Sequence, residues 1–441
     1  MTSVWTVSQT TYLKYKILNF YYLNIIIMEG GKIKGKGAYG CVFQPSLECK
    51  YPNETEKNKN YISKLVVSNE AQKELRISKF IENNLPNYEK YALIWEKNCT
   101  PSSKQIDKDL HKCNFAINIR KKNNDYSLLV AQYGGTTFEM KINSLIRIIK
   151  KNKLQIFKNN YINFIKETEG LFLGVKEFYE NNFIHNDIKE LNILKLVKSN
   201  DSLKKGVRFI DFGLSAVIPK DNNFLKERSY SCFNEPRWYY IYPPEYLYCM
   251  ANTFELEDEY DKDSYKKRML YNNIRDVHVK IVHTCRSNKE FDDRIKNIIL
   301  KAKDGDYNSN DTLYEIFMKV DIYSLAMSFV FLFIYSRGSN VKKNISKIFS
   351  KSKKGTFLGD FKLLLKKMLD LNYKKRIEPP NAYIEFTRMI NKEYPKSISL
   401  VKTKKRSKAK RSKAKRSKAK RSKAKKKQSK KEAKRSKAKI N

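Results

Sequence analysis

The chain has 441 residues, 41% of them hydrophobic with 24 Phe and 29 Tyr, which is enough to bury the core of one large domain or two ordinary ones. Its formal net charge is +44, and residues 402–441 carry half of it, with 23 Lys and Arg against one acidic residue. Seven scattered cysteines, an odd number, argue against a disulfide framework and predict free thiols in a reducing compartment.

Two apolar stretches, Ile17–Met28 and Ile322–Tyr335, are too short for a membrane-spanning helix, and the first lacks the cleavage site of a signal peptide. The sequence therefore predicts no transmembrane segment, and the second stretch predicts a buried core helix. Cys99, His111 and Cys113 have no Cys-x-x-Cys pair beside them, so no metal site is predicted there.

The N-terminal part allows two interpretations. Residues 1–27 are either an N-terminal extension or are not translated, because Met28 can start the protein just before a glycine-rich motif. That motif is Gly35-Lys36-Gly37-Ala38-Tyr39-Gly40-Cys41-Val42. Ile33–Phe43 predicts two strands joined by a loop, in which glycines let backbone N–H groups approach phosphates closely.

Strands and helices alternate after this loop. Tyr61–Val67 alternates as a strand does, and Glu70–Ile81 has apolar residues at helical spacing. Ser127–Ala131 predicts another strand, which the pair Gly134-Gly135 ends. Asn160–Asn182 predicts one long amphipathic helix.

Further short motifs follow this helix. The first is His185-Asn186-Asp187-Ile188-Lys189-Glu190-Leu191-Asn192, and the second is Asp211-Phe212-Gly213. Farther along the chain come Tyr242-Pro243-Pro244-Glu245, then Asp321-Ile322-Tyr323-Ser324-Leu325, and finally Arg376.

In this order and spacing, the motifs resemble G-x-G-x-x-G-x-V, H-x-D-x-K-x-x-N and D-F-G of the eukaryotic-type serine/threonine protein kinase superfamily. The chain is most similar to protein kinases of giant DNA viruses of the mimivirus type. The resemblance implies an α+β, bilobal protein-kinase-like fold over residues 28–395. A small β-rich N-lobe would span about 28–132 and a larger, mainly helical C-lobe about 136–395, with a polar insertion at about 248–313.

The resemblance implies that the chain binds ATP and Mg²⁺. Lys64 would contact the α and β phosphates and pair with Glu74, or alternatively with Glu70, although ten residues between Lys64 and Glu74 are few for the family. Asn192 and Asp211 would bind Mg²⁺ through oxygen atoms. The residues expected around the nucleotide are Gly35, Gly37, Ala38, Tyr39, Gly40, Val42, Lys64, Gln132, Tyr133 and Leu194.

The catalytic residues are expected in the loop of residues 185–192. Asp187 would orient the attacking hydroxyl or accept its proton, and Lys189 would lie beside the transferred phosphate, as in serine/threonine kinases. His185 would be structural. Two departures from the family matter. Asn186 replaces the arginine that in many kinases binds a phosphate on the activation segment, which argues against that switch, and the aromatic segment Cys232–Tyr242 leaves substrate choice open.

The basic tail repeats the unit Arg406-Ser407-Lys408-Ala409-Lys410 and has almost no core-forming residue, so residues 402–441 are predicted to be disordered. Three interpretations of the tail remain open: non-specific binding of nucleic acid, a nuclear-localisation or membrane-surface patch, and repeat expansion without function.

The resulting prediction is an intracellular serine/threonine protein kinase with a protein substrate, in host cytoplasm or nucleus, or in the virion if the source is viral. The alternative is a pseudokinase or nucleic-acid-tethered scaffold that binds nucleotide without efficient transfer.

Overall fold

Most of the chain between residues 32 and 392 is described by the computed structural model. The described residues are 32–36, 40–51, 60–102, 113, 125–151, 153–196, 206–218, 240–249, 265–307, 309–335, 339–392 and 394. The predictions for residues 1–27, for residues 37–39 of the glycine loop, for residues 232–239 and for the tail of residues 402–441 lie outside them.

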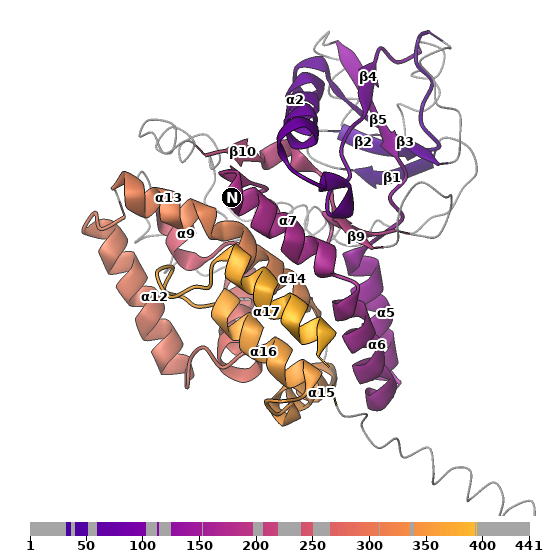
Figure 1. Ribbon diagram of the computed structural model, residues 1–441. Helices are drawn as coiled ribbons and strands as arrows, with labels where there is room; N and C mark the ends of the chain where they lie inside the picture. The colour runs from indigo at the N-terminus through magenta and orange to yellow at the C-terminus, as the bar shows by residue number, and fades with distance from the viewer. Residues whose placement is uncertain are drawn as a thin grey trace, which may run out of the picture. The chain divides into compact units, whose positions relative to one another are not determined.

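The N-terminal part is a five-stranded antiparallel sheet with the order β1-β2-β3-β5-β4 (Figure 1). Its strands are β1 (Lys32–Lys36), β2 (Gly40–Gln44), β3 (Tyr61–Val67), β4 (Lys97–Cys99) and β5 (Tyr126–Gln132). Helix α2 (Ser68–Asn84) follows β3 directly and packs against β3 and β5. Ala71 of α2 lies in a small cluster with Val66 and Leu129 of the sheet. The predicted strands and helix are thus present here.

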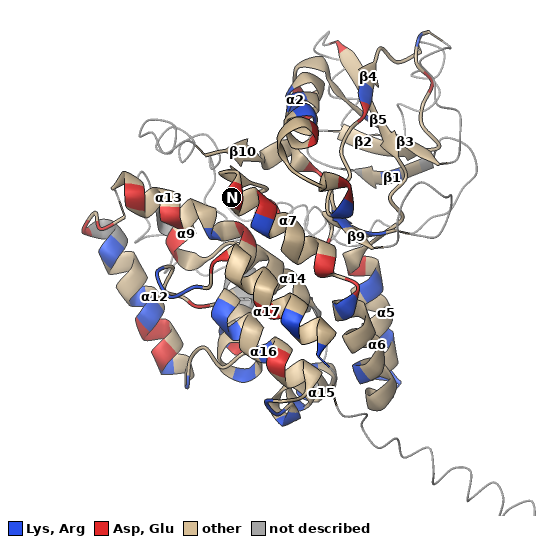
Figure 2. Ribbon diagram, viewed as in Figure 1, with Lys and Arg blue, Asp and Glu red and all other residues tan. Residues whose placement is uncertain are grey.

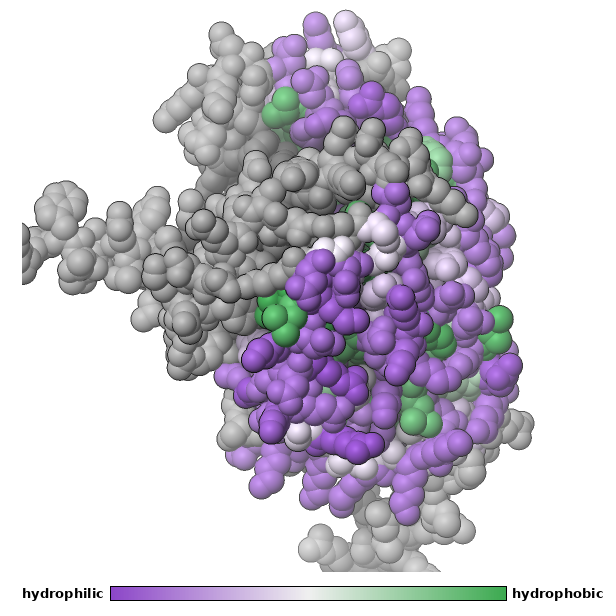
Figure 3. Space-filling model, turned by 90° about the vertical axis from the view of Figure 1, so that its left-hand side faces the viewer, coloured by the Kyte–Doolittle hydropathy of each residue, from purple (hydrophilic) through white to green (hydrophobic). Residues whose placement is uncertain are grey.

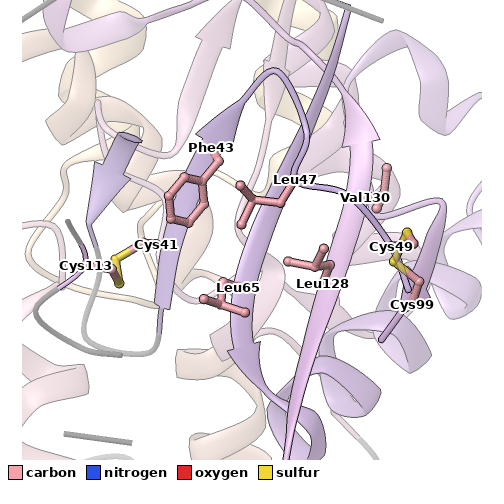
Figure 4. Close-up of a cluster of buried hydrophobic side chains, with 9 residues drawn as sticks. All are labelled: Cys41, Phe43, Leu47, Cys49, Leu65, Cys99, Cys113, Leu128 and Val130. Atoms are coloured by element: carbon pink, nitrogen blue, oxygen red, sulfur yellow. A yellow bond between two sulfur atoms is a disulfide. The ribbon is translucent and has the colours of Figure 1, made fainter. Parts of the chain in front are cut away.

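One core cluster of the sheet contains two disulfide bonds, which the sequence analysis did not expect. Cys41 is bonded to Cys113, and Cys49 to Cys99 (Figure 4). All four are at most 7% exposed, among Phe43, Leu47, Leu65, Leu128 and Val130. The expectation of free thiols was therefore wrong for these four cysteines. It failed because residues 50 and 72 positions apart in the sequence meet only after the strands pair.

The rest of the described chain is mainly helical. The helices are α5 (Phe138–Lys150), α6 (Leu154–Lys166), α7 (Glu169–Glu180), α9 (Pro244–Cys249), α11 (Tyr265–Asp276), the π-helix η5 (Val277–Ile281), α12 (Asn288–Lys303), α13 (Asn310–Met318), α14 (Val320–Tyr335), α15 (Ser339–Lys351), α16 (Phe357–Met368) and α17 (Pro379–Asn391). The shorter elements are η2 (Tyr88–Lys90), β6 (Thr136–Thr137), β7 (Phe183–Ile184), β8 (Ile193–Lys195), β9 (Val207–Phe209), η4 (Phe212–Leu214) and β10 (Ala216–Val217).

Helix α14 is the centre of this helical region. It packs against α5, α7, α11, α13, α15 and α16, as its apolar sequence predicts (Figure 1). Aromatic rings fill the surrounding core: Phe172 of α7 stacks on Phe386 of α17 at 3.9 Å between ring centroids and on Phe329 of α14 at 5.9 Å. Two small sheets, β6-β8-β9 and β7-β10, lie beside these helices and carry the loops of the candidate site.

The long helix predicted over Asn160–Asn182 is divided into α6 and α7. The break occurs at Thr168, whose hydroxyl donates a hydrogen bond to the carbonyl of Ile165 at 2.6 Å. At Gly170 a Cβ atom would lie only 2.4 Å from the carbonyl oxygen of Lys90, so glycine lets the chain segments approach. Apolar periodicity alone does not reveal such a break.

The described part of the predicted polar insertion, residues 248–313, is largely helical. Its helices bury Val277, Ile281 and Phe291, and Figure 2 shows acidic and basic residues interspersed along α12. In the view of Figure 3, hydrophilic residues cover most of the described surface and hydrophobic ones form small separate groups. Across the described ranges, none of the helices has the length and apolar character needed to cross a membrane.

Candidate active site

Lys64 joins the sheet to the loops of the helical region. Strand β3 carries this side chain, and its Nζ lies 2.7 Å from Oε1 of Glu74 and 3.4 Å from Oδ1 of Asp211. The ten-residue separation between Lys64 and Glu74 suffices because α2 begins at Ser68, immediately after β3 ends, so no loop intervenes. Glu70, the alternative partner, instead pairs with Lys73 at 2.7 Å on the exposed side of the helix.

Charge and burial act against each other at Lys64. Burial lowers the pKa of this lysine, but the nearby carboxylates of Asp211 and Glu74 more than compensate, so its pKa is raised and it stays protonated. Glu74 is fixed further by Trp95, whose indole N–H donates to Oε2 at 2.9 Å. The ammonium group is therefore held in one place by two acidic partners from different parts of the chain.

Asp187 is held by hydrogen bonds within the loop of residues 185–192, which lies between β7 and β8. Its Oδ2 accepts hydrogen bonds from Lys189 Nζ at 2.8 Å and from Asn192 Nδ2 at 2.7 Å. The same Nδ2 donates to the backbone carbonyl of Asp187 at 3.0 Å. Burial raises the pKa of Asp187 to about 6, and the charge of Lys189 opposes that rise. The structure thus brings three of the predicted residues together.

Asp211 and Asn192 offer oxygen atoms that suit Mg²⁺. Asp211 has a φ of 62°, which turns the chain into η4, and its side chain remains 44% exposed while Lys64 is only 10% exposed. Although burial opposes it, the charges of Lys64 and Lys189 lower the pKa of Asp211. Because Nδ2 of Asn192 is used by Asp187, its Oδ1 is the atom left to accept or ligate.

These two side chains would hold a magnesium ion only together with other oxygen ligands, such as phosphate oxygens. Among the described residues there is no cluster of three or more His, Cys, Asp or Glu side chains that could hold a metal ion alone. The donor set therefore fits a cation that arrives with a phosphate compound.

His185 is structural, as its motif predicts. Its ring is buried and packs against Phe212 at 4.6 Å between ring centroids, and Nε2 lies 3.1 Å from the carbonyl oxygen of Ile210. Burial lowers the pKa of His185 to about 4, so the ring is neutral near pH 7. Its backbone N–H and that of Asn186 donate to the two oxygens of Asp321, at 2.6 and 3.0 Å.

The residues predicted around the nucleotide come from strands β1, β2, β3, β5 and β8 and from the segment after β5. Gly35 of β1 is paired with Val42 of β2. Gly40 permits the close pairing of β2 with β3, because a Cβ atom there would lie 2.3 Å from the carbonyl oxygen of Leu65. Only Gly37, Ala38 and Tyr39 of this set lie outside the described residues.

The segment after β5 and strand β8 supply the other predicted nucleotide contacts. Gln132 ends β5, and the backbone N–H of Tyr133 donates to the carbonyl of Asn60 at 2.5 Å. Leu194 of β8 approaches Gly134 so closely that a Cβ atom there would lie 2.5 Å from its Cδ1. Leu194 and the segment after β5 are thus neighbours.

Comparison with protein-family models gives no match, and no curated protein matches the chain. The functional assignment therefore depends on the geometry of the residues themselves.

Buried polar contacts that the sequence did not reveal surround the loop of residues 185–192. Tyr240 donates a hydrogen bond to Glu190, while Tyr242 and Tyr246 donate to Asn186 at 2.7 Å each. The signal in the sequence was the aromatic character of Cys232–Tyr242, which does not indicate the hydrogen-bond acceptors of these tyrosines.

A buried ion pair fixes helix α9 beside this loop. Nη2 of Arg376 lies 2.5 Å from Oε1 of Glu245, and the two side chains are 0% and 1% exposed. More than a hundred residues separate the two partners in the sequence.

Proposed function

We propose that the chain is a serine/threonine protein kinase that transfers the γ-phosphate of ATP to a protein hydroxyl group. The observation that carries the proposal is the position of Lys64, which contacts both Glu74 and Asp211. The N-terminal antiparallel sheet followed by a mainly helical region supports a bilobal, kinase-like fold. The family resemblance of the three motifs agrees with this assignment.

Each residue of the site has a task in such a transfer. A bound Mg²⁺ would supply the positive charge that neutralises the phosphate oxygens. Asn192 and Asp211 have the oxygen atoms to ligate it, and the ammonium group of Lys64 would hold the non-transferred phosphates. Lys189 lies 2.8 Å from Asp187, where its charge would also face the phosphate that moves.

Asp187 is suited to receive the proton of the substrate hydroxyl. Its pKa of about 6 leaves most of the carboxylate ionised at pH 7, while keeping it more basic than an ordinary aspartate. The brace from Asn192 holds its orientation. A hydroxyl placed against the free edge of this carboxylate would be aimed at the phosphate, which is the positioning that phosphate transfer requires.

A protein substrate is favoured over a small molecule by the ion pair between Glu245 and Arg376. Small-molecule kinases of related fold usually lack the segment that ends at this glutamate. The hydroxyl class is inferred from Lys189, because lysine at this place is typical of serine/threonine kinases.

The test is γ-phosphate transfer from Mg-ATP to a basic protein, followed by phosphoamino-acid analysis. We expect phosphoserine or phosphothreonine from the wild type, and turnover lower by about 10²- to 10⁴-fold in Asp187→Asn. Asp306→Asn, on an exposed turn, is the matched control and should keep full turnover. Nucleotide binding without transfer by the wild type would contradict the proposal and favour the nucleotide-binding scaffold.

A further inference from the structure

We propose that the hydroxyl groups of Tyr240, Tyr242 and Tyr246, here called the tyrosine clamp, hold the catalytic loop in its reacting arrangement without a phosphate group on the preceding segment. They are positioning residues, because their hydroxyl groups bind Glu190 and Asn186, which flank Asp187 and Lys189 along the chain. This inference rests on the proposed kinase function and adds how its catalytic loop is kept in place.

Asn186, the residue before Asp187, is the main point of attachment. The hydroxyl of Tyr242 donates to its backbone carbonyl at 2.7 Å, and the hydroxyl of Tyr246 donates to its side-chain Oδ1 at 2.7 Å. Its backbone N–H is bound by Asp321 at 3.0 Å. Asn186 is 1% exposed and has a φ of 59°, a conformation that asparagine tolerates better than most residues. Its backbone is therefore held from two sides.

The other end of the loop is held by Tyr240. Its hydroxyl donates to Oε2 of Glu190, the residue after Lys189, and both partners are buried. The contacts with Asn186 and Glu190 thus enclose the pair of Asp187 and Lys189 from both sides along the chain. A shift of the loop would leave buried acceptors without donors, which is costly in a protein interior.

Helix α14 supports both the clamp and the loop. Ser324 donates to the carbonyl of Ile241, between two clamp residues, at 2.7 Å. One turn earlier, Asp321 binds the N–H groups of the loop. The ring of Tyr240 packs against Phe331 of the same helix, 5.6 Å away between ring centroids. The clamp and the loop are therefore placed by one rigid element.

Ring packing also orients Tyr242 and Tyr246. Tyr246 lies 5.1 Å from Phe317 of α13 and 5.0 Å from Tyr242 between ring centroids. Tyr242 and Tyr246 lie on either side of Glu245 in the sequence, and the ion pair of Glu245 with Arg376 anchors α9. These tyrosines are buried, so their hydroxyl groups reach Asn186 without the entropy cost of ordering exposed side chains.

The neutral side chain of Asn186 also supports a loop that is held without a phosphate group. A neutral asparagine cannot form the charge-assisted hydrogen bonds by which an arginine holds a phosphate. Both carbonyl oxygens of Asn186 are instead occupied by neutral hydroxyl groups. The described contacts therefore need no added charge to hold the loop.

The first experiment compares Tyr242→Phe, Tyr246→Phe and their double variant with Tyr161→Phe. Tyr161 is a matched control, since it is also buried and its hydroxyl donates to the backbone carbonyl of Phe329 at 2.8 Å. Phe329 is far from the loop along the chain. We expect kcat to fall about tenfold in each clamp variant while the affinity for Mg-ATP is unchanged. The control should match the clamp variants in thermal stability and keep its kcat.

A second measurement does not depend on activity. Amide hydrogen exchange of residues 185–192, in which four backbone N–H groups have bonded partners, should be at least about tenfold faster in the clamp variants than in Tyr161→Phe. Phosphatase-treated wild type should keep its turnover. Unchanged exchange in the clamp variants, an equal increase in the control, or loss of turnover on phosphatase treatment would overturn the clamp. A wild type that transfers no phosphate would overturn the proposed kinase function. The hydrogen-exchange comparison would still test whether the clamp holds the loop of residues 185–192.

Discussion

The sheet of β1–β5 and the helical region from α5 to α17 stabilise their cores by different means. The core cluster of the sheet packs leucine and valine side chains and Phe43 around two disulfide bonds (Figure 4). The helical region stacks aromatic rings around α14, and Cys285 in this region is a free thiol. A region with few elements buries less apolar surface per residue, so covalent links add relatively more to its stability.

The candidate site spans both regions. Lys64 and Glu74 belong to the sheet and α2, whereas Asp187, Asn192 and Asp211 belong to the loops of the helical region. The sheet side is held by charge, through ion pairs, and the loop side mainly by hydrogen bonds with buried partners. Conditions that weaken one region should therefore affect one half of the site first.

The largest expected effect is in the helical region, at its buried ion pair. Replacing Arg376 by Ala leaves Glu245 buried without a cationic partner, which should lower the free energy of unfolding by about 3–5 kcal/mol. Denaturant unfolding would measure it. Arg388→Ala, on the exposed face of α17, is the control and should cost under about 1 kcal/mol. Equal effects for both variants would show that the ion pair does not stabilise this region.

The next effect concerns the sheet. Replacing Cys49 and Cys99 by Ala removes the link between residues 50 positions apart and should cost about 2–4 kcal/mol. Because Lys64 lies in the same sheet, affinity for Mg-ATP should fall, whereas hydrogen exchange of residues 185–192 should be unchanged. The buried free thiol of Cys285 provides the control, as Cys285→Ala should leave nucleotide affinity intact. Faster exchange in residues 185–192 would contradict the division into two regions.

The sequence predicted the parts of the site whose geometry is local. In the motif of residues 185–192, Asp187 and Asn192 lie five positions apart, so one turn of the chain brings them together. The pairing of Lys64 with Glu74 was expected from the family resemblance, with Glu70 as the alternative, and the structure forms it because β3 leads directly into α2. Each of these contacts is set by spacing along one segment.

Contacts that depend on tertiary packing could not be predicted in the same way. The clamp tyrosines lie 50 to 60 positions from their acceptors in the sequence, and a run of aromatic residues does not indicate which groups they will bind. The disulfide partners meet only once the strands pair. Beside the break at Thr168, the carbonyl of Lys90 approaches Gly170 from a distant segment. The residue types and the hydrophobic periodicity of the sequence do not indicate which distant residues will be in contact.

The smallest effect separates charge from hydrogen bonding on the loop side. Burial raises the pKa of Asp321 to about 7, against the opposing N–H bonds of His185 and Asn186, and the charge of Asp187 raises it further. Between pH 4 and 7 the folded protein thus binds more protons at this group than the unfolded chain does. Raising the pH therefore favours unfolding.

Asp321→Asn removes this titration, although its amide can accept from only one of the two N–H groups. From pH 5 to pH 8 the wild type should lose about 2–3 kcal/mol of stability relative to the variant, so the gap between their unfolding free energies changes by that amount. Denaturant unfolding at pH 5, 6, 7 and 8 measures the gap, with Asp306→Asn as an exposed control that should run parallel to the wild type. A gap that stays constant with pH would mean that Asp321 is already ionised at pH 5, and that its two hydrogen bonds outweigh burial in holding the catalytic loop.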